Sequence, residues 1–407
     1  MRHSGPARPL ADCRPTCRRG QRSKADAASS GECSSDNSAP LLVSYYRSMS
    51  SATESRPEGR LSVSVIIPHL KGRDILLACL DSLDGSLPGG SEVIVVDTGC
   101  ADGSIDEALA SSPEITVVKA GDGAGFARGC NVGIREAQSP WVLLLNDDAV
   151  LRPDCVRRLL QIGEQKSNIG AVQPKVLSAS APEIFDAAGA AGGFIDRYGH
   201  PFARGRLFDC VEQDRGQYDT EVDLFWGAGV CLLIRRQCLD EVGDLDESFF
   251  SHMEEIDFCW RMLLVGWQTV FAPEAEILHV GGATLARGSP RKIFLNHRNG
   301  LWMMIKNLSL RSLVTVLPMR VVLDTAAFAY HLAAGRFKVA LAVLLALVAA
   351  VIGLPRIIAS RWEIQKLRQK TDKDLAHLIL PRSVAIAYYL RGIQHFEDIE
   401  WKVTAGS

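Results

Sequence analysis

Between residues 61 and 150, short apolar runs alternate with amphipathic stretches. Each run is rich in Val, Ile or Leu, which is typical of strands buried on both faces of a sheet. The runs span residues 63–68, 92–97, 115–119 and 141–145. The stretches between them carry apolar residues at helical spacing, as at Leu76, Leu80 and Leu83. Strands that alternate with helices predict an α/β fold with a Rossmann-like, mostly parallel sheet.

The pattern is weak between residues 175 and 222, where glycines are frequent and no period persists. A long stretch of this kind predicts an irregular, substrate-facing loop. Regular patterning resumes with an apolar segment at 225–236 and an acidic helix start at 252–257. Two strand-like segments follow, at 268–272 and 277–279.

The C-terminal third is strongly apolar. Residues 312–335 are interrupted only by Arg320, Asp324 and His331, and residues 339–355 carry no charge. A run of about 17 residues is at the lower limit for a membrane-spanning helix. Basic residues follow it, so we expect a helix that lies on the cytoplasmic face of a bilayer. One short span, or a soluble helical hairpin packed on the rest of the protein, are the alternatives.

The overall composition, with 47% apolar and 23% charged residues among 407, is that of a folded globular protein. The net charge of -2 gives no argument for a nucleic-acid partner. The eleven cysteines form no CxxC pair, so we expect no zinc site and a reducing compartment. Residues 1–58 are rich in Ser, Arg, Ala and Pro. We expect this segment to be disordered, or to precede a true start at Met49, rather than to be a transit peptide.

Two adjacent carboxylates, Asp147 and Asp148, follow the buried run at 141–145 directly after Asn146. Ionised groups at the end of a buried strand belong at the edge of the sheet, where open α/β folds bind ligands. Hard oxygen ligands suit Mg²⁺ or Mn²⁺, which usually complete their coordination with substrate phosphates. A turn that caps a helix is the structural alternative.

An ordered series of motifs runs across residues 61–305. After the opening strand at 63–68, the chain reads VIVVD and DGS, GFARGCN, LLLNDD, FFSHMEEIDFCWR and ILHVGG. This series resembles the family 2 glycosyltransferases with the GT-A fold, in particular their bacterial rhamnosyltransferase-like members. The resemblance implies a nucleotide-diphosphate-sugar as donor. It also implies a set of donor-binding residues: Pro68, Asp97, Gly125, Arg128, Asn131, Trp226 and Arg298.

Within that set, the resemblance gives Asp97 hydrogen bonds to the base, with capping of its own turn as the alternative. The helix start that carries Gly125, Arg128 and Asn131 would approach the diphosphate. Trp226 would lie under the donor sugar unless it is a core residue, and Arg298 would touch the diphosphate.

The same resemblance implies the catalytic and metal-binding residues. Asp148 is the expected principal ligand of Mg²⁺ or Mn²⁺, with Asp147 beside it and His279 as a third ligand or a diphosphate contact. Glu255 is the expected general base, with Glu254 as its neighbour. At position 146, where the family carries an acid or Asn, the chain has Asn, which is a weaker neutral ligand. The sequence departs from the pattern at Glu255, where relatives usually carry aspartate, and at His69 and Thr98 in the nucleotide pocket.

These observations predict three segments: an N-terminal extension at 1–58, a GT-A catalytic domain at 59–306 and a membrane-associated helical region at 307–407. The predicted function is inverting, metal-dependent transfer of a sugar to a cell-envelope or lipid-linked glycan at the cytoplasmic face of the inner membrane. A non-catalytic glycan- or nucleotide-binding scaffold is the alternative. A processive polysaccharide synthase is a weaker one, because the chain lacks a QxxRW motif and several clear spans.

Overall fold

The computed structural model describes residues 61–281 and 288–401. The N-terminal segment at 1–58 lies outside these described residues. Within them, the main sheet has ten strands. They are β1 (Val63–His69), β2 (Glu92–Asp97), β3 (Thr116–Lys119), β4 (Trp141–Leu145), β5 (Ala149–Leu151), β6 (Ile169–Ser178), β7 (Ala181–Phe185), β12 (Val222–Leu224), β13 (Cys231–Arg235) and β14 (Gln268–His279).

The strands lie in the order β12-β14-β6-β13-β4-β1-β2-β3, with β5 beside β14 and β7 beside β6. The neighbours β4, β1, β2 and β3 all run parallel. Their carboxyl ends therefore meet at one edge of the sheet, the usual place for a ligand in such folds. The α/β fold class predicted from the sequence is confirmed, and β13 adds an antiparallel strand between β4 and β6.

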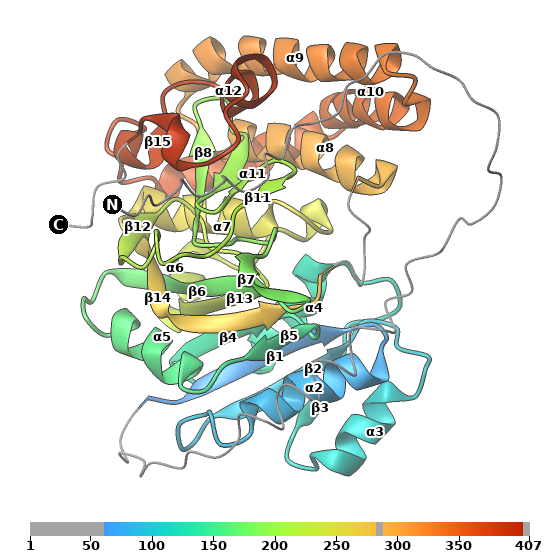
Figure 1. The fold of residues 1–407 in the computed structure, drawn as a ribbon, viewed down its shortest axis with the longest axis vertical. Coiled ribbons are helices and arrows are strands. Elements are labelled where there is room, and N and C mark those ends of the chain that lie inside the picture. The colour runs from blue at the N-terminus through green and yellow to red at the C-terminus, as the bar shows by residue number, and fades with distance from the viewer. Residues whose placement is uncertain (1–60, 282–287, 402–407) are drawn as a thin grey trace, which may run out of the picture. The chain divides into compact units, whose positions relative to one another are not determined.

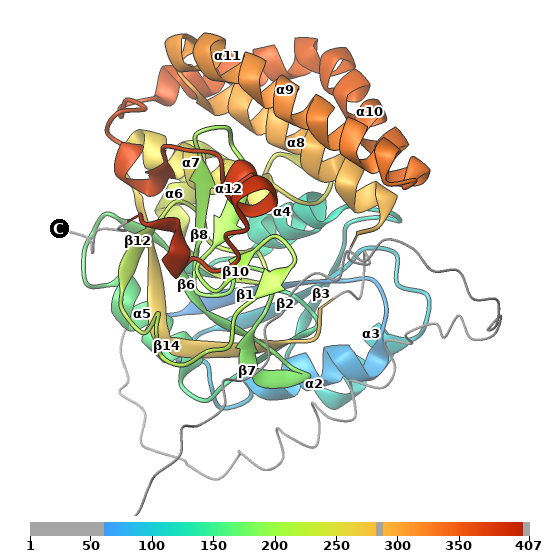
Figure 2. The ribbon, with the colours of Figure 1, turned by 45° about the horizontal axis from the view of Figure 1, so that its top comes forward.

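Helices cover both faces of this sheet (Figures 1 and 2). They are α2 (Arg73–Leu83), α3 (Ser104–Ser111), α4 (Phe126–Glu136), α5 (Cys155–Gly163), α6 (Arg236–Val242) and α7 (Glu254–Val265), with a short 3₁₀ turn η2 at Glu247–Phe249. Helices α2 and α5 share one hydrophobic core, and α4 and α7 contribute to the other. In β1, Val65 and Ile67 enter the first core and Ile66 the second, as the two-residue period of a strand requires.

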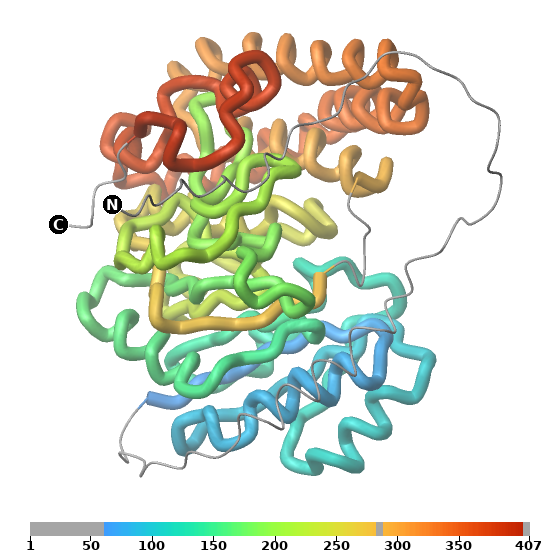
Figure 3. Tube along the Cα trace, viewed as in Figure 1, coloured from blue at the N-terminus to red at the C-terminus, as the bar shows by residue number. Residues whose placement is uncertain are grey.

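The prediction of an irregular loop at 175–222 is wrong. The segment completes β6, forms β7 and supplies four strands of a second sheet: β8 (Gly193–Asp196), β9 (Pro201–Ala203), β10 (Arg206–Leu207) and β11 (Cys210–Val211). Most of these strands are only two to five residues long, which is too short for a hydrophobic period to be visible. Their pairing partners can also be far away in the sequence, since β8 pairs with β15 (Ile379–Leu380) near the C-terminus. In Figure 3 the red C-terminal segment returns to the green one.

The two strand-like segments at 268–272 and 277–279 form one strand. β14 runs from Gln268 to His279 beside β6, and an irregularity between Ala272 and Glu276 breaks its register. The last residue of β14 is His279, so the histidine lies at the end of the strand, as the sequence predicted.

The C-terminal part is helical: α8 (Pro290–Asn307), α9 (Leu310–Ala333), α10 (Phe337–Ile352), α11 (Leu354–Leu367) and α12 (Val384–Arg391), with 3₁₀ turns η3 (Ala376–Leu378) and η4 (Glu397–Ile399). Helices α10 and α11 pack on α8, and α9 packs on α10. Among the described residues, one helix, α9, is long and apolar enough to cross a membrane. Helices α10 and α11 meet that criterion only as a pair bent by 62°.

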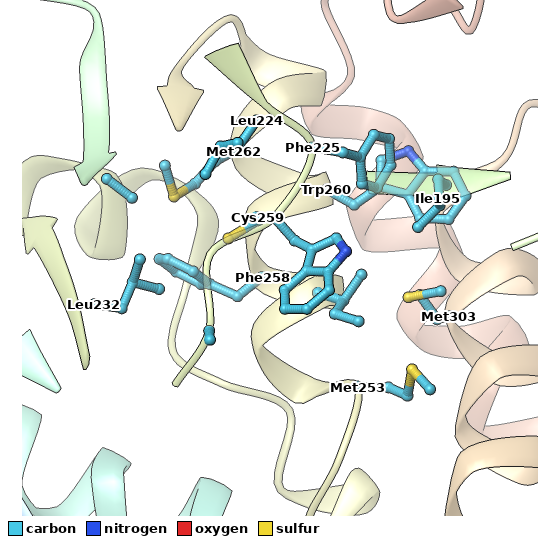
Figure 4. Packing of buried hydrophobic residues seen from close by; sticks show 14 of the residues in the cluster. Ile195, Leu224, Phe225, Leu232, Met253, Phe258, Cys259, Trp260, Met262 and Met303 are labelled. Carbon is cyan, nitrogen blue, oxygen red and sulfur yellow. The ribbon is translucent and has the colours of Figure 1, made fainter. Parts of the chain in front are cut away.

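Helix α7 is held between the sheets and α8. Figure 4 shows Phe258, Cys259 and Trp260 of α7 surrounded by apolar side chains, with Phe225 on one side and Met303 of α8 on another. All three α7 residues are buried. Because tightly packed cores resist movement, this packing fixes the start of α7, which carries Glu254 and Glu255.

Candidate functional site

The acidic pair at the end of β4 lies at the edge of the sheet, as predicted. Every residue of β4 is buried, and the chain turns at Asn146, whose N–H donates to the carbonyl of Val230 (2.9 Å). Asp148 is buried, whereas Asp147 keeps 17% of its side chain exposed. β5 then begins at Ala149, so two strands hold the pair between them.

Asp148 faces His279 at the end of the neighbouring β14. Asp148 Oδ1 lies 3.1 Å from His279 Nε2, and His279 Nδ1 lies 2.9 Å from Oδ1 of Asp186. The first contact has the distance of an ion pair without the angles of a hydrogen bond, and Asp148 Oδ1 is buried without a hydrogen-bond partner among the described residues. Burial alone would lower the pKa of His279, but the two carboxylates outweigh it and raise that pKa to about 10. Burial likewise favours a higher pKa for Asp148, and contact with the histidine turns the net change downward.

Asp147 turns toward β1. Its Oδ2 lies 2.7 Å from Nδ1 of the fully buried His69, and His69 Nε2 lies 2.6 Å from Ser104 Oγ. Burial raises the pKa of Asp147, and His69 partly offsets that effect. One oxygen of Asp147 is therefore engaged by His69. The sequence marked His69 only as a departure from the family pattern, and its contact with the acidic pair was missed.

His69 also lies near Cys100 and Asp102, and one ligand atom from each of the three residues falls within 4.8 Å of the others. We assign no metal to this group, because both ring nitrogens of His69 already have hydrogen-bond partners.

Asp97 ends β2 and caps its own turn. Its Oδ1 accepts hydrogen bonds from the N–H groups of Gly99 (2.9 Å) and Cys100 (2.8 Å). Burial favours a higher pKa for Asp97, but these bonds together with the nearby positive charge of Lys119 outweigh it, so the pKa lies below its ordinary value. Capping, the alternative from the sequence, is therefore present, and base binding stays a prediction. Pro68 lies one strand away, packed against Gly129 of α4.

The first turn of α4 approaches another loop. A Cβ at Gly125 would collide with the carbonyl and ring of Phe250, and the N–H of Ala127 donates to that carbonyl (3.4 Å). Gly125 is therefore needed for the close approach of the loop that precedes α7. Arg128 is exposed on the same turn, which leaves it available to an anionic ligand.

Three residues predicted to contact the donor make hydrogen bonds within the protein, and donor binding by them stays a prediction. The amide of Asn131 accepts from the N–H of Leu245 (3.0 Å) and donates to its carbonyl (2.8 Å). Trp226 is a buried core residue whose Nε1 donates to the carbonyl of Phe194 (2.9 Å). Arg298 donates to main-chain carbonyls of the loop before α7. All three side chains hold the fold together.

The loop before α7 has an unusual backbone. Phe250, His252 and Met253 have φ of 68°, 69° and 74°, a left-handed conformation that costs most residues about 1–3 kcal/mol each. Asn299 of α8 donates its Nδ2 to the carbonyls of Phe249 (3.0 Å), Ser251 (3.0 Å) and His252 (2.7 Å). This bracing by α8 was not visible in the sequence. Strained backbone of this kind is typical of functional sites.

The loop delivers Glu254 and Glu255 to the first turn of α7. One oxygen of each carboxylate, Oε2, is buried without a hydrogen-bond partner among the described residues. Burial raises the pKa of Glu254 well above its ordinary value and that of Glu255 to about 7. Glu254 is buried, while Glu255 keeps some exposed surface and lies against Gly229, the residue before Val230.

Asp257 anchors the same helix. It is fully buried and contacts Arg261 Nε (3.1 Å), Lys306 Nζ (2.8 Å) and Asn307 Nδ2 (2.8 Å). The contact with Arg261 is an ion pair between residues four apart on the same helix. Lys306 and Asn307 end α8, so this network ties the glutamate-bearing helix to the C-terminal helices.

Residues 59–295 match the model of a protein family described as glycosyltransferase like family 2. The match covers more than half of the 407 residues. This chain belongs to the family 2 glycosyltransferases. The family predicted from the motif series is therefore confirmed, and the protein is a hexosyltransferase by membership and by its relatives.

Two curated relatives of this glycosyltransferase illustrate the family. The N-acetylglucosaminyl-diphospho-decaprenol L-rhamnosyltransferase of Mycobacterium tuberculosis is 26% identical over 223 residues, which are 51% of this chain and 72% of the relative. The low-salt glycan biosynthesis hexosyltransferase of Haloferax volcanii is 26% identical over 204 residues, 49% of this chain and 61% of the relative.

A solved structure of GalNAc-T7 with UDP, GalNAc and Mn²⁺ has the same fold as this glycosyltransferase. The TM-score is 0.50 at 16% identity, over 61% of this chain and 48% of the other. The GT-A fold predicted from the motifs is thereby confirmed.

Proposed function

We propose that this glycosyltransferase moves a hexose, with inversion, from a nucleotide-diphosphate-sugar to a hydroxyl group of a cell-envelope or lipid-linked glycan. One observation carries the proposal. Asp148 and Glu255 each present a buried oxygen without a hydrogen-bond partner among the described residues. The two lie on one edge of the sheet, linked through Asn146, Val230 and Gly229. Such groups are costly unless a ligand uses them.

The donor side is the edge around Asp148. The oxygen of Asp148 that lacks a hydrogen bond and the facing Nε2 of His279 fit a divalent cation such as Mg²⁺ or Mn²⁺, with Asp147 beside them. The cation would take the place of the proton on Nε2, because a metal-bound histidine is neutral. A bound divalent cation neutralises charge that builds on the leaving diphosphate. The exposed Arg128 at the start of α4 adds positive charge for the same diphosphate.

The acceptor side is the first turn of α7. A pKa near 7 leaves Glu255 about half ionised at neutral pH, which suits a general base. As the acceptor oxygen attacks the anomeric carbon, its proton passes to Glu255 and the bond to the diphosphate breaks. A single displacement of this kind inverts the anomeric configuration. Glu254, which is more deeply buried, supports α7 rather than receiving the proton.

The test uses full-length protein, a panel of nucleotide sugars with Mg²⁺ or Mn²⁺, and glycan acceptors. Glu255→Gln should keep donor affinity within twofold and lose at least a hundredfold in kcat, because one general base contributes about 10²–10⁴-fold. Glu363→Gln, at an exposed position on α11, is the matched control. NMR of the product gives its anomeric configuration. Unchanged turnover in Glu255→Gln would exclude this residue as base, and donor binding without transfer by the unmutated protein would favour a scaffold.

We also propose that the protein lies on the cytoplasmic face of the inner membrane through α9 and α10. Their outward side chains form an apolar face, including Val314, Val322, Phe337, Leu341 and Val351, each more than half exposed. The name of the M. tuberculosis relative specifies a decaprenol-linked compound, and we extend a lipid-linked acceptor to this chain. A bilayer is the partner that suits such a face, because large exposed apolar patches on proteins mark interaction sites.

The polar residues of α9 favour a helix that lies on the membrane surface over a helix that spans the bilayer. Arg320 and Asp324 are buried and paired with each other (3.0 Å). Arg320 also donates to the carbonyl of Tyr198 (2.9 Å), and Asp324 contacts His297 (2.9 Å). A spanning α9 would have to give up these contacts.

Basic residues border the apolar face and complement an anionic leaflet. They are exposed at Arg311, Arg336, Lys338 and Arg356, near the ends of the helices, where they can reach lipid headgroups.

Co-sedimentation with vesicles tests this location. The protein should bind vesicles that contain phosphatidylglycerol more tightly than neutral ones. The double substitution Leu341→Ser with Val351→Ser should weaken binding at least tenfold, whereas Leu109→Ser, at an exposed apolar position on α3, should not. Hydrogen exchange near Tyr198 should stay unchanged on the vesicles. Faster exchange there would indicate that α9 leaves the protein to span the bilayer.

A further inference from the structure

Asp186 is a buried carboxylate at the edge of the sheet that the sequence did not single out. It follows β7, and its main-chain N–H donates to the carbonyl of Val176 in β6 (2.8 Å). Its Oδ1 accepts a hydrogen bond from the N–H of Ala188 (2.7 Å). The first bond holds the main chain of Asp186, and the second holds its carboxylate.

The fixed carboxylate is aimed at His279. Asp186 Oδ1 lies 2.9 Å from His279 Nδ1, so Nδ1 carries the hydrogen that this contact requires. The opposite ring nitrogen, Nε2, then faces Asp148 Oδ1 at 3.1 Å. A ring nitrogen and a carboxylate oxygen thus point at the same place. Such a pair of donor atoms suits a cation between them.

We propose that Asp186 is a positioning residue, which holds the His279 ring so that Nε2, together with Asp148, binds the divalent cation of the proposed transfer reaction. Asp186 touches neither the cation nor the substrate. It sets the orientation of the ring and strengthens Nε2 as a ligand, as carboxylates behind metal-bound histidines generally do. This inference rests on the proposed function, and it adds a residue to it.

The position of Asp186 depends on the part of the fold that sequence patterning missed. β7 pairs with the end of β6, and β6 pairs with β14, which ends at His279. Two neighbouring strand pairings therefore bring the carboxylate and the ring together from positions 93 residues apart. The pairing of β6 with β14 extends to Ser178 and His279, so the ring and its partner belong to one continuous part of the sheet.

Mn²⁺ binding to the full-length protein tests the proposal without any assay of transfer. Electron paramagnetic resonance gives the dissociation constant. Electron spin echo spectra detect a ¹⁴N coupling when a histidine nitrogen binds the ion. Loss of a carboxylate behind a ligating histidine typically lowers metal affinity about 10–100-fold. We expect that loss in Asp186→Ala together with a weakened ¹⁴N coupling, and a smaller loss in Asp186→Asn, which keeps an acceptor oxygen.

Asp324→Asn is the matched control, because Asp324 Oδ1 makes the same 2.9 Å contact with a histidine Nδ1, that of His297. It should leave Mn²⁺ affinity within twofold. Thermal unfolding shows whether each variant is folded, and Asp186→Asn carries the test if Asp186→Ala is not.

Wild-type affinity and an intact ¹⁴N coupling in a folded Asp186 variant would overturn the inference. So would a lack of Mn²⁺ binding by the unmutated chain. Sugar transfer by that same chain is assayed separately, so the proposed function stands or falls on its own result.

Discussion

Replacing Glu255 with glutamine should stabilise the folded protein while it abolishes transfer, and the gain in stability should depend on pH. Burial raises the pKa of Glu255 from 4.5 to about 7. A carboxyl group with a raised pKa contributes its full stability below pH 4.5, and that contribution is lost as the pH rises to about 7. The difference corresponds to about 3 kcal/mol in the free energy of unfolding. Glutamine never ionises, so it avoids this loss.

Urea unfolding measures the effect. At pH 8 the Glu255→Gln variant should be more stable than the unmutated protein by up to about 3 kcal/mol, and at pH 4.5 the two should be equal. Glu363→Gln, at an exposed position, should change neither value. Equal stability of Glu255→Gln and unmutated protein at pH 8 would refute the claim that the buried, ionised carboxylate of Glu255 lowers the free energy of unfolding.

The pH profile of transfer gives a second readout of the same group. A base with a pKa of 7 is about one tenth ionised at pH 6 and about nine tenths ionised at pH 8. kcat/KM of the unmutated protein should therefore rise about tenfold between these values. A glutamate with its ordinary pKa of 4.5 would give a nearly flat profile over this range. A flat profile would therefore contradict the assignment of Glu255 as base.

Three further substitutions probe the support of the site. Asp257→Ala removes a buried carboxylate that contacts Arg261, Lys306 and Asn307 and leaves Lys306 with Asp246 alone. It should cost about 3–5 kcal/mol in urea unfolding; a loss below 1 kcal/mol would show that the network adapts. Gly125→Ala forces the loop away from α4 and should cost about 1–3 kcal/mol with a larger fall in kcat; full activity would show that the close approach is dispensable. Asn131→Ala should cost about 1–3 kcal/mol with unchanged donor affinity by calorimetry, and a tenfold weaker donor affinity would restore its donor-binding role.

The first half of the fold could be predicted because its physics is local. β1 and β4 are unbroken apolar runs between amphipathic helices, and such runs form buried parallel strands wherever they occur. The second sheet could not be predicted in this way. β8 is four residues long and pairs with β15, almost two hundred residues away. No local pattern encodes a pairing of that kind.

The residues of the candidate site divide in the same way into those that the sequence could predict and those that it could not. Asp148, His279 and Glu255 could be proposed from the sequence because each lies near the end of a strand or the start of a helix within a recognisable motif, and their roles stay predictions. Asp186 and His69 were missed, because their importance lies in contacts that exist only after folding.

Asn131 and Trp226 lie in or beside recognisable motifs, yet their polar groups bond to main chain inside the core. A motif identifies a residue but not the direction in which its side chain points.

Helix α8 holds the loop before α7 in its conformation. This limits how far the protein can be shortened from its C-terminus without loss of activity. The family match ends at residue 295, inside α8 and before Arg298 and Asn299. A fragment ending there would keep β4 and β14, with Asp148 and His279 at their ends. It would lack the amide that holds three carbonyls in place, so the left-handed residues would relax and Glu255 would lose its position. We therefore expect the smallest active unit to be longer than the family signature, and a protein that ends at residue 295 should not transfer sugar.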